Sequence, residues 1–388
     1  MTLCALTGAR LFDGERFLED HALVLDGNRI QAVVPRHELA ADMPREALPG
    51  GILAPGFVDL QVNGGGGVLF NNAPSVASLE RMTRGHRTQG TTRLLPTTIS
   101  DTEPNLEACI SAVREARALN PGILGVHIEG PFFSHFRRGV HREEYLRPLR
   151  DRDVDYLIDV AAELPVLLTL APEMTTPGQI GRLVQAGIRV SAGHTNATQA
   201  QVAAAVSEGL SGFTHLFNAM RNLEGREPGV VGTALADRTT WAGIIVDGWH
   251  VHSESVRLAW QAKPHGHLYL VSDAMATVGS DVPGFDLYGE RIQRVDGRLV
   301  NGEGKLAGSA IGLLEAVRNC VEQVGIPLEE ALRMASLYPA TYFGVADQLG
   351  RLQPGYQADL VHFSAEWEVS RTWVAGQSER QNSVVQGV

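Results

Sequence analysis

The sequence predicts an α/β fold, a (β/α)8 TIM-type barrel with a small β-sandwich domain built from both termini. Two observations lead to this prediction. In the central part, short apolar runs alternate eight times with helical segments, as in parallel strands joined by crossover helices. At both ends, short strands follow one another across tight turns. An open doubly wound sheet is the structural alternative, but Gly64–Gly67 lacks the spacing of a dinucleotide-binding motif.

The two ends of the chain carry the signals of a β domain. In residues 3–34, the turn signals Asp13-Gly14 and Asp26-Gly27-Asn28 separate apolar runs and leave no room for helices. In the C-terminal part, Ala358–Phe363 and Thr372–Val374 are predicted strands. Because domain termini often lie close together, we expect the two ends to pair. The predicted boundaries are 1–52 and 345–388 for the small β domain, and 53–344 for the catalytic barrel.

Eight apolar runs are the predicted barrel strands, and about 250 residues are typical for such a barrel. They are Phe57–Asn63, Thr91–Pro96, Leu124–Glu129, Val166–Leu170, Arg189–His194, Phe213–His215, Ala242–Val246 and Leu268–Asp273. Intervening helices have recognisable N-caps. Ser75 precedes the segment of Leu79 and Met82, and Thr198 precedes the predicted helix Gln199–Glu208.

An insertion follows the eighth run, from Ala274 to Lys305. Its Asp296-Gly297 pair is a hairpin signal, and a hairpin here would overhang the face of the barrel where the strands end. Two helices are predicted after it, Ser309–Val324 and Pro327–Phe343. Their apolar residues recur at helical spacing, which indicates packing rather than a cofactor site.

Composition narrows the classes of function. With 388 residues and 44% apolar content, the chain can bury a large core. Its formal charge of −11 argues against nucleic acid or an anionic membrane surface as a partner. Three cysteines without a CxxC pair predict neither disulfides nor a zinc ribbon. Without a signal-peptide pattern or a long apolar run, we expect a cytoplasmic protein.

Four polar residues stand at equivalent places, the C-terminal ends of predicted strands: Glu129, His194, His215 and Asp273. In a TIM-type barrel this is the face where catalytic groups collect. Each alone is more often structural, but four together predict a site. One carboxylate and two imidazoles form a catalytic zinc set with an open position for water, and Asp273 can accept the proton of that water.

Longer motifs run along essentially the whole chain: Pro55–Gly67, His127–Pro131, Leu170–Glu173, Ser191–Ala197, Thr214–Met220, Gly225–Gly229, Asp247–His250, Val271–Ala274, Leu306–Ser309 and Gly355–Val361. In this order they resemble the N-acetylglucosamine-6-phosphate deacetylases, a family of the amidohydrolase superfamily. The resemblance implies a (β/α)8 barrel with a small β domain. It also implies hydrolysis of the 2-acetamido group of N-acetylglucosamine 6-phosphate, which yields glucosamine 6-phosphate and acetate.

The resemblance also assigns roles to residues. Glu129, His194 and His215 match the family's metal ligands and suit one divalent ion per subunit, zinc first, with iron, cobalt or manganese as alternatives. Asp273 matches the residue that acts as general base and then as general acid. His250 is expected to hydrogen-bond the carbonyl oxygen or the sugar.

Two devices of other superfamily members are missing from this sequence. Gln61 and Asn63 stand where many members have a His-x-His pair, so we expect a vestigial second-metal position and a single metal. A carboxylated lysine at the end of the fourth strand is excluded, because that place reads Ala171-Pro172-Glu173. The two lysines, Lys263 and Lys305, lie elsewhere.

Substrate contacts are expected from several loops. The resemblance assigns the phosphate to His141, Asn218, the backbone of Ala219, and Arg226, whose side chain can bind two phosphate oxygens. Arg226 acts either in its own site or in that of the neighbouring subunit, which predicts a homodimer. His135 is a rival to His141, and His127 is expected to be a barrel hydrogen bonder, with metal contact left open.

The remaining expected contacts come from the loops around the barrel mouth. Val140 and Trp249 are further predicted substrate contacts. The segment of Leu306, Ala307 and Gly308 is expected to close over the sugar and to be mobile without ligand.

Two other functions stay open at this point. The same site suits N-acetylgalactosamine 6-phosphate, which differs at one hydroxyl, or another N-acyl amine or cyclic amide. A non-catalytic scaffold is the second alternative. The intact set of Glu129, His194, His215 and Asp273 argues against the scaffold.

Overall fold

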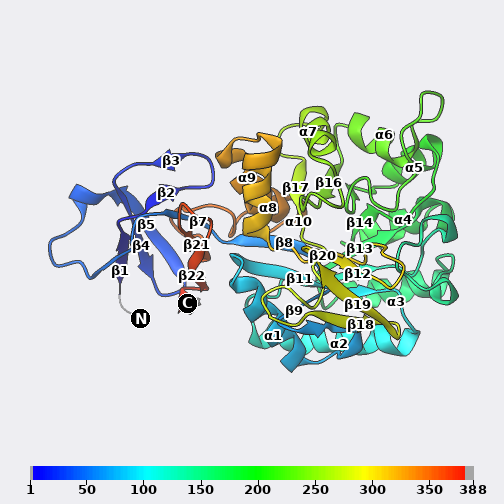
Figure 1. Cartoon of the computed structure of the whole chain (residues 1–388), viewed down its shortest axis with the longest axis horizontal. Coiled ribbons are helices and arrows are strands. Elements are labelled where there is room, and N and C mark those ends of the chain that lie inside the picture. The colour runs from blue at the N-terminus through cyan, green and yellow to red at the C-terminus, as the bar shows by residue number, and fades with distance from the viewer. Residues whose placement is uncertain (1–2, 381–388) are drawn as a thin grey trace.

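The computed structural model describes residues 3–380 and shows a barrel beside a smaller β domain (Figure 1). Eight parallel strands pair in sequence order, and each predicted run overlaps one of them. They are β8 (Phe57–Val62), β11 (Thr91–Ile99), β12 (Val126–Glu129), β13 (Val166–Leu170), β14 (Arg189–Ala192), β15 (Gly212–Phe213), β16 (Trp241–Ile244) and β17 (Leu268–Leu270). This order confirms the barrel and rules out a doubly wound sheet.

The seam between the first and the last strand is closed beyond the end of β17. Val62 and Ala274 form a parallel bridge there. The Asp273 N–H donates to the Gln61 carbonyl oxygen at 3.0 Å. The seam therefore ties the predicted catalytic aspartate to the strand that carries Gln61.

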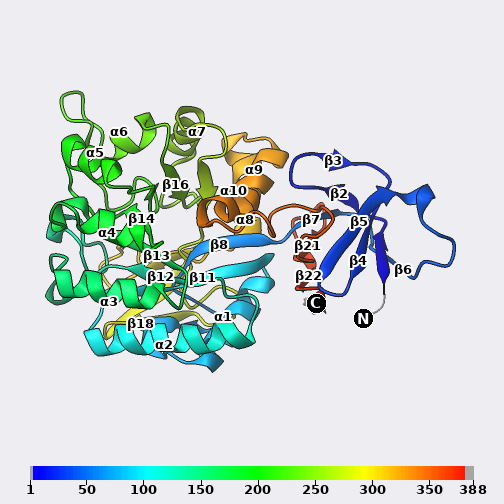
Figure 2. The ribbon, with the colours of Figure 1, turned by 180° about the vertical axis from the view of Figure 1, so that it is seen from behind.

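Helices cover the outside of the barrel (Figure 2). They are α1 (Val76–Arg87), α2 (Glu103–Leu119), α3 (Asp151–Ala161), α4 (Gln179–Gln185), α5 (Gln199–Ser207), α6 (Gly229–Ala236), α7 (Ser253–Ala262), α8 (Leu313–Asn319), α9 (Leu328–Ala335) and α10 (Leu337–Phe343). Both predicted caps are present. Ser75 Oγ accepts the Ser78 N–H, and Thr198 forms a capping box with Gln201. No helix within residues 3–380 is long and apolar enough to cross a membrane.

The two helices predicted after the insertion are wrong in their extent. The first does not begin at Ser309, because the Ser309 N–H donates to the Asp273 carbonyl oxygen and extends the barrel edge. It begins at Leu313, and a π-helical turn, Cys320–Val324, completes it. The second breaks at Ser336 into α9 and α10. Pro339 cannot continue a helix from the preceding turn, so it lies in the first turn of α10 instead.

The small β domain consists of two sheets that share one apolar core, as predicted. One has the order β5-β4-β1-β6, and the other β23-β22-β21-β7-β2-β3. Their N-terminal strands are β1 (Cys4–Thr7), β2 (Arg10–Phe12), β3 (Phe17–Leu18), β4 (His21–Asp26), β5 (Arg29–Pro35), β6 (Arg45–Ala47) and β7 (Ile52–Pro55). The C-terminal strands are β21 (Leu360–Phe363), β22 (Val369–Val374) and β23 (Gln377–Arg380).

Pairing between the chain ends holds this domain together. β21 runs antiparallel to β7, with Leu360 opposite Pro55. Leu23 and Leu360, one from each sheet, are fully buried in the shared core. The boundaries 1–52, 53–344 and 345–388 stay a prediction, and residues 381–388 lie outside the described part of the chain.

The insertion after β17 forms a three-stranded antiparallel sheet, drawn in yellow in Figure 1: β18 (Gly284–Leu287), β19 (Glu290–Val295) and β20 (Arg298–Val300). Asp296 and Gly297 form the predicted turn, with φ of 49° and 80°. The Tyr288 hydroxyl donates to the Ser100 carbonyl oxygen just beyond β11. On the same side lies a short hairpin, β9 (Gly64–Gly65) and β10 (Val68–Leu69). The insertion thus covers part of the barrel mouth, as predicted.

Candidate active site

Strand ends bring the four predicted polar residues together. Glu129 is the last residue of β12, and the other three follow β14, β15 and β17 within three residues. Glu129, His194 and His215 are 2%, 5% and 4% exposed, and Asp273 is partly buried. They come from four different strands, so only the closed barrel places them side by side.

The backbone at three of these residues explains why the strands end earlier than predicted. His194, His215 and Asp273 have φ of 48°, 36° and 51°, in the left-handed region. Each such residue costs about 1–3 kcal/mol, and such strain collects at functional sites. The left-handed turn ends the regular strand before each of these residues, and all three side chains line the cavity at the barrel mouth.

Glu129, His194 and His215 face one another as potential ligands. The Glu129 Oε1 lies 3.2 Å from His215 Nε2 and 3.5 Å from His194 Nε2. The two Nε2 atoms are 3.0 Å apart. The His194 Nδ1–H donates to the Arg137 carbonyl oxygen at 3.0 Å, so the lone pair of neutral His194 lies on Nε2. Two imidazoles and a carboxylate directed at one point fit a divalent cation.

Charge in the cluster favours the ligand forms of Glu129 and His194. Burial opposes ionisation of Glu129, but the two histidines beside it, His194 and His215, hold the pKa of its carboxyl well below the usual range. Burial lowers the pKa of His194. Burial opposes protonation of His215, but its hydrogen bond with Glu129, and after it the charge of Glu129, raise the pKa of this imidazole. Glu129 is therefore anionic and His194 neutral at neutral pH, as metal ligands must be.

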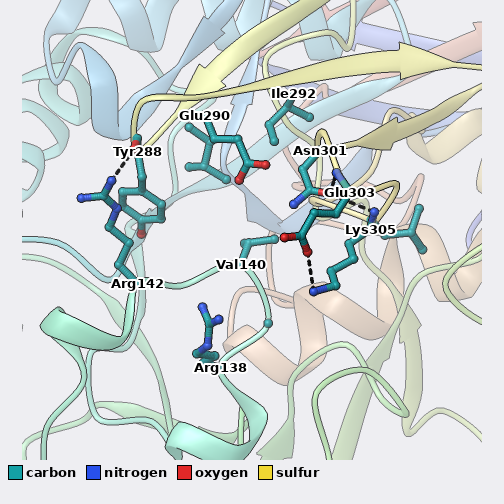
Figure 3. A pocket seen from close by; sticks show the side chains of 12 residues that line it. Arg138, Val140, Arg142, Tyr288, Glu290, Ile292, Asn301, Glu303 and Lys305 are labelled. Carbon is teal, nitrogen blue, oxygen red and sulfur yellow. Dashed lines mark hydrogen bonds and ion pairs between the residues drawn. The ribbon is translucent and has the colours of Figure 1, made fainter.

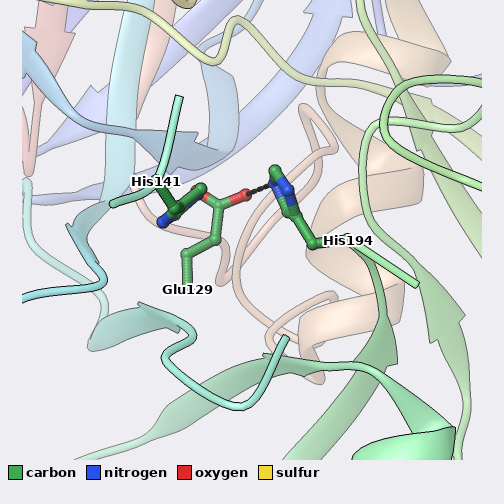
Figure 4. Close-up of side chains that lie close together, drawn as sticks. All are labelled: Glu129, His141 and His194. Atoms are coloured by element: carbon green, nitrogen blue, oxygen red, sulfur yellow. Dashed lines mark ion pairs between the residues drawn. The ribbon is translucent and has the colours of Figure 1, made fainter. Parts of the chain in front are cut away.

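His141 joins this cluster, which the sequence did not indicate (Figure 4). One ligand atom each from Glu129, His141 and His194 lie within 4.8 Å of one another, and all three residues are buried. The Ser100 N–H points to His141 Nδ1 at 3.4 Å, and the Ser100 hydroxyl lies 2.9 Å from the same atom. This places the lone pair of neutral His141 on Nδ1. His141 therefore offers a proton on Nε2, whereas His194 offers a lone pair.

Gln61 and Asn63 donate hydrogen bonds to the two carboxylates of the site. The Gln61 Nε2 donates to Glu129 Oε1 at 3.0 Å and to Asp273 Oδ1 at 3.1 Å, and the Asn63 Nδ2 donates to Asp273 Oδ1 at 2.6 Å. Burial, and after it the charge of Glu129, raise the pKa of the Asp273 carboxyl. The two carboxamides thus hold the carboxylate of Asp273 in place.

The loop after β16 presents His250. Its Nδ1 lies 2.6 Å from Asp247 Oδ2, and Asp247 Oδ1 accepts the backbone N–H groups of Trp249 and His250. Asp247 therefore fixes the orientation of the imidazole. Trp249 is 48% exposed, and the Arg298 guanidinium of the insertion lies 4.6 Å from its ring centre.

A cavity of about 200 Å³ surrounds the cluster. Its wall consists of Asn63, Ile99, Glu129, Gly139, Val140, His141, His194, His215, Asn218, Ala219, His250, Asp273, Met275, Leu306 and Gly308. Predicted substrate contacts on this wall are Val140, His141, Asn218, Ala219, His250, Leu306 and Gly308. Ile99 and Met275 were missed, since apolar side chains give no chemical signal in a sequence. Ala307 is buried in the core under the insertion instead.

A second cavity, of about 380 Å³, lies beside the first and shares the wall residues Gly139, Val140 and Leu306 (Figure 3). Its rim is charged, with Arg138, Arg142, Glu290, Glu303 and Lys305. Lys305 pairs with Glu303 at 2.7 Å. This cavity holds none of the four strand-end residues.

Several predicted residues lie away from the cavity wall. Arg226 and Trp249 are exposed and do not line it. His135 is half exposed and lies 3.5 Å from Glu143. His127 is fully buried, and its two ring nitrogens contact the hydroxyls of Thr97 and Thr169 at 3.1 and 2.7 Å. His127 is thus the barrel hydrogen bonder that was expected.

Comparison with known proteins decides the family. The model of the amidohydrolase family matches residues 52–378, and that of the NagA composite domain matches residues 3–53. The chain belongs to the amidohydrolase family.

Two curated relatives of this amidohydrolase carry different substrate names. The N-acetylgalactosamine-6-phosphate deacetylase of Shewanella sp. (strain ANA-3) is 43% identical over 88% of this chain and 86% of its own. The N-acetylglucosamine-6-phosphate deacetylase of Haemophilus influenzae is 38% identical over 96% of this chain and 98% of its own. The resemblance seen in the motifs is therefore confirmed.

Solved structures agree with the fold of this amidohydrolase. N-acetylglucosamine-6-phosphate deacetylase from Pasteurella multocida superimposes with a TM-score of 0.94 at 38% identity, over 98% of this chain and all of that one. A mutant of the Mycobacterium smegmatis enzyme, in complex with N-acetyl-D-glucosamine-6-phosphate, gives 0.89 at 31% identity, over 97% and 99%.

Proposed function

We propose that this amidohydrolase hydrolyses the acetamide of N-acetylglucosamine 6-phosphate to glucosamine 6-phosphate and acetate. The observation that carries the proposal is the convergence of Glu129, His194, His215 and Asp273 in one cavity. The wider activity, deacetylation of an N-acetylhexosamine 6-phosphate, follows from family membership and from relatives that are 38% and 43% identical over nearly the whole chain.

One divalent metal ion suits the cluster, and we propose Glu129, His194 and His215 as its ligands. Zinc is the first choice, and iron, cobalt and manganese are the alternatives. When bound, such an ion lowers the pKa of a water molecule and polarises the acetamide carbonyl. The tautomer of His141 supports His215 as the third ligand, because the Nε2 proton of neutral His141 leaves no lone pair there. Gln61 and Asn63 donate to carboxylates, which supports a single ion.

Asp273 is the proposed general base and acid. Its carboxylate takes a proton from the attacking water and returns a proton to the departing amine. Asn63 and Gln61 direct their N–H groups at Oδ1, so Oδ2 is left for the proton. The raised pKa of this carboxyl suits a group that must hold a proton between the two steps. His250, oriented by Asp247, is proposed to hydrogen-bond the acetamide oxygen or the sugar.

The phosphate end of the sugar is assigned to other residues of the same cavity wall. We propose His141, Asn218 and Ala219 as contacts there, with Val140, Leu306 and Gly308 against the sugar. Trp249 and Ala307 remain predicted contacts, as does the mobility of the 306–308 segment.

Arg226 is proposed to complete the site of a second subunit. It is exposed, and it is absent from the cavity wall of its own chain. We therefore propose a homodimer. A cytoplasmic location, without nucleic acid or membrane as a partner, also stays a proposal, and the free state of Cys4, Cys109 and Cys320 is consistent with a reducing compartment.

N-acetylgalactosamine 6-phosphate is the second candidate substrate, because the relative that is 43% identical carries that name. Acetate release from both phosphosugars by the zinc-loaded protein tests the choice. We expect a higher kcat/KM for the gluco substrate. A higher value for the galacto substrate would transfer the assignment to it. No acetate from either would support the scaffold alternative.

A further inference from the structure

Glu173 contacts the turn that follows His194. It lies in the short 3-10 helix Pro172–Met174, directly after β13. The Thr195 hydroxyl donates to Glu173 Oε2 at 2.5 Å, and the Asn196 N–H donates to Glu173 Oε1 at 2.6 Å. Both carboxylate oxygens are therefore used by the two residues after His194.

The turn at His194 needs such support. His194 has a φ of 48°, a conformation that costs a non-glycine residue about 1–3 kcal/mol and persists only where neighbouring bonds enforce it. The Ser134 N–H donates to the His194 carbonyl oxygen at 3.0 Å, and the Thr195 N–H donates to the Ala219 carbonyl oxygen at 3.0 Å. The carboxylate of Glu173 adds two charge-assisted bonds, which are stronger than neutral ones.

A second connection reaches the His194 ring itself. The Asn196 Oδ1 accepts the Arg137 Nε–H at 3.1 Å, and the Arg137 carbonyl oxygen accepts the His194 Nδ1–H at 3.0 Å. Glu173 fixes Asn196, Asn196 holds Arg137, and Arg137 orients the imidazole. These contacts connect the turn after His194 to the His194 ring. They fix the tautomer in which the lone pair lies on Nε2.

We propose that Glu173 is a positioning residue for His194 and that it sets the metal affinity of the site. The proposal rests on the assignment of His194 as a metal ligand. Glu173 lies just beyond the end of β13, the fourth barrel strand, and it does not line the cavity. It acts on His194 indirectly, through the backbone turn that follows this residue.

Glu173→Gln tests this proposal. The amide has the shape of the carboxylate, but its NH2 group faces a donor, so at least one of the two bonds is lost. Zinc affinity of the metal-free variant is measured by competition with a chromophoric chelator. We expect it to be about 10- to 100-fold weaker than that of the wild-type chain, as for other residues that support metal ligands. At saturating zinc we expect kcat near that of the wild type.

Glu208→Gln is the matched control. Glu208 is also half buried, and it accepts the N–H groups of Gly178 and Gly181 at 2.8 and 3.2 Å, beyond the C-terminal end of α5. We expect the Glu208→Gln variant to bind zinc as tightly as the wild type does, even if its Tm falls as much as the Tm of Glu173→Gln. Equal zinc affinities of the two variants would overturn the proposal.

Two further outcomes are distinguishable. If Glu173→Gln does not fold, Thr195→Val takes its place in the experiment, because it lacks the hydroxyl that is bonded to Glu173 Oε2. We expect this variant to bind zinc more weakly than the control does. Unchanged affinity of Thr195→Val would then overturn the proposal. A wild-type chain that binds no zinc would contradict the metal assignment itself, and the positioning role with it.

Discussion

Burial determines the protonation state of His86, a histidine near the site. His86 is fully buried under the glycine-rich segment after β8, and its Nε2–H donates to the Gly64 carbonyl oxygen at 2.9 Å. Burial lowers the pKa of His86 from 6.5 to about 4. The folded protein therefore keeps this imidazole neutral at pH values where the unfolded chain protonates it.

This pKa predicts a loss of stability in acid. The free energy of unfolding is highest above pH 6.5, where this imidazole is neutral in both states. It decreases as the pH falls from 6.5 through about 4, because the unfolded chain takes up the proton first. Lowering the pKa from 6.5 to about 4 corresponds to roughly 3 kcal/mol. We expect His86→Gln to lose less unfolding free energy than the wild type between pH 7 and pH 4, measured by urea denaturation. Parallel pH profiles of the two proteins would contradict this.

The sequence indicated the residues with distinctive chemistry and missed those that act by position. Glu129, His194, His215 and Asp273 stood out because ionisable residues at strand ends are recognisable. Ile99 and Met275 look like any core residue, yet they form part of the cavity wall. The place of His141 beside Glu129 depends on a long loop, whose course no local pattern specifies.

Among the elements, strands were easier to predict than the ends of helices. Each apolar run overlaps a barrel strand, because period and length are local properties. The start of α8 was wrong because Ser309 finds a partner in Asp273, far away in the sequence. The break at Ser336 was missed although Pro339 gave a local signal for it.

The inserted sheet covers part of the barrel mouth, so we expect its anchoring to affect substrate binding. Tyr288 anchors it to the barrel through the bond from its hydroxyl to the Ser100 carbonyl oxygen. Loss of one hydrogen bond costs about 0.5–1.5 kcal/mol, so we expect Tyr288→Phe to raise KM for the phosphosugar roughly two- to tenfold with kcat nearly unchanged. Tyr356→Phe is the control, since this hydroxyl donates to the Ala346 carbonyl oxygen near the small β domain. An equal KM for both variants would refute the anchoring role.

For the whole molecule, the question is whether one chain makes a complete site. The cavity contains the proposed acetamide end in full, but Arg226 lies outside it. In a symmetric dimer, the same loop of each subunit would serve the other.

Subunit mixing tests this arrangement. Arg226→Ala and Asp273→Asn are each expected to be nearly inactive alone. In a mixed dimer, the Arg226→Ala chain keeps its own Asp273 and receives Arg226 from its partner. After refolding an equal mixture, we expect about a quarter of the wild-type acetate release, since half of the dimers are mixed and each has one intact site. No recovery in a verified mixed dimer would place Arg226 in its own subunit's site.

Catalysis is proposed to depend on a metal-binding cluster together with Asp273 as base and acid. Asp273→Asn tests it most directly, with metal content and acetate release measured on the same sample. The amide can still accept the N–H groups of Asn63 and Gln61, so the site should keep its geometry. We predict one divalent ion per subunit and a turnover lower by about two to four orders of magnitude. Turnover near that of the wild type would contradict the role of Asp273 as base and acid.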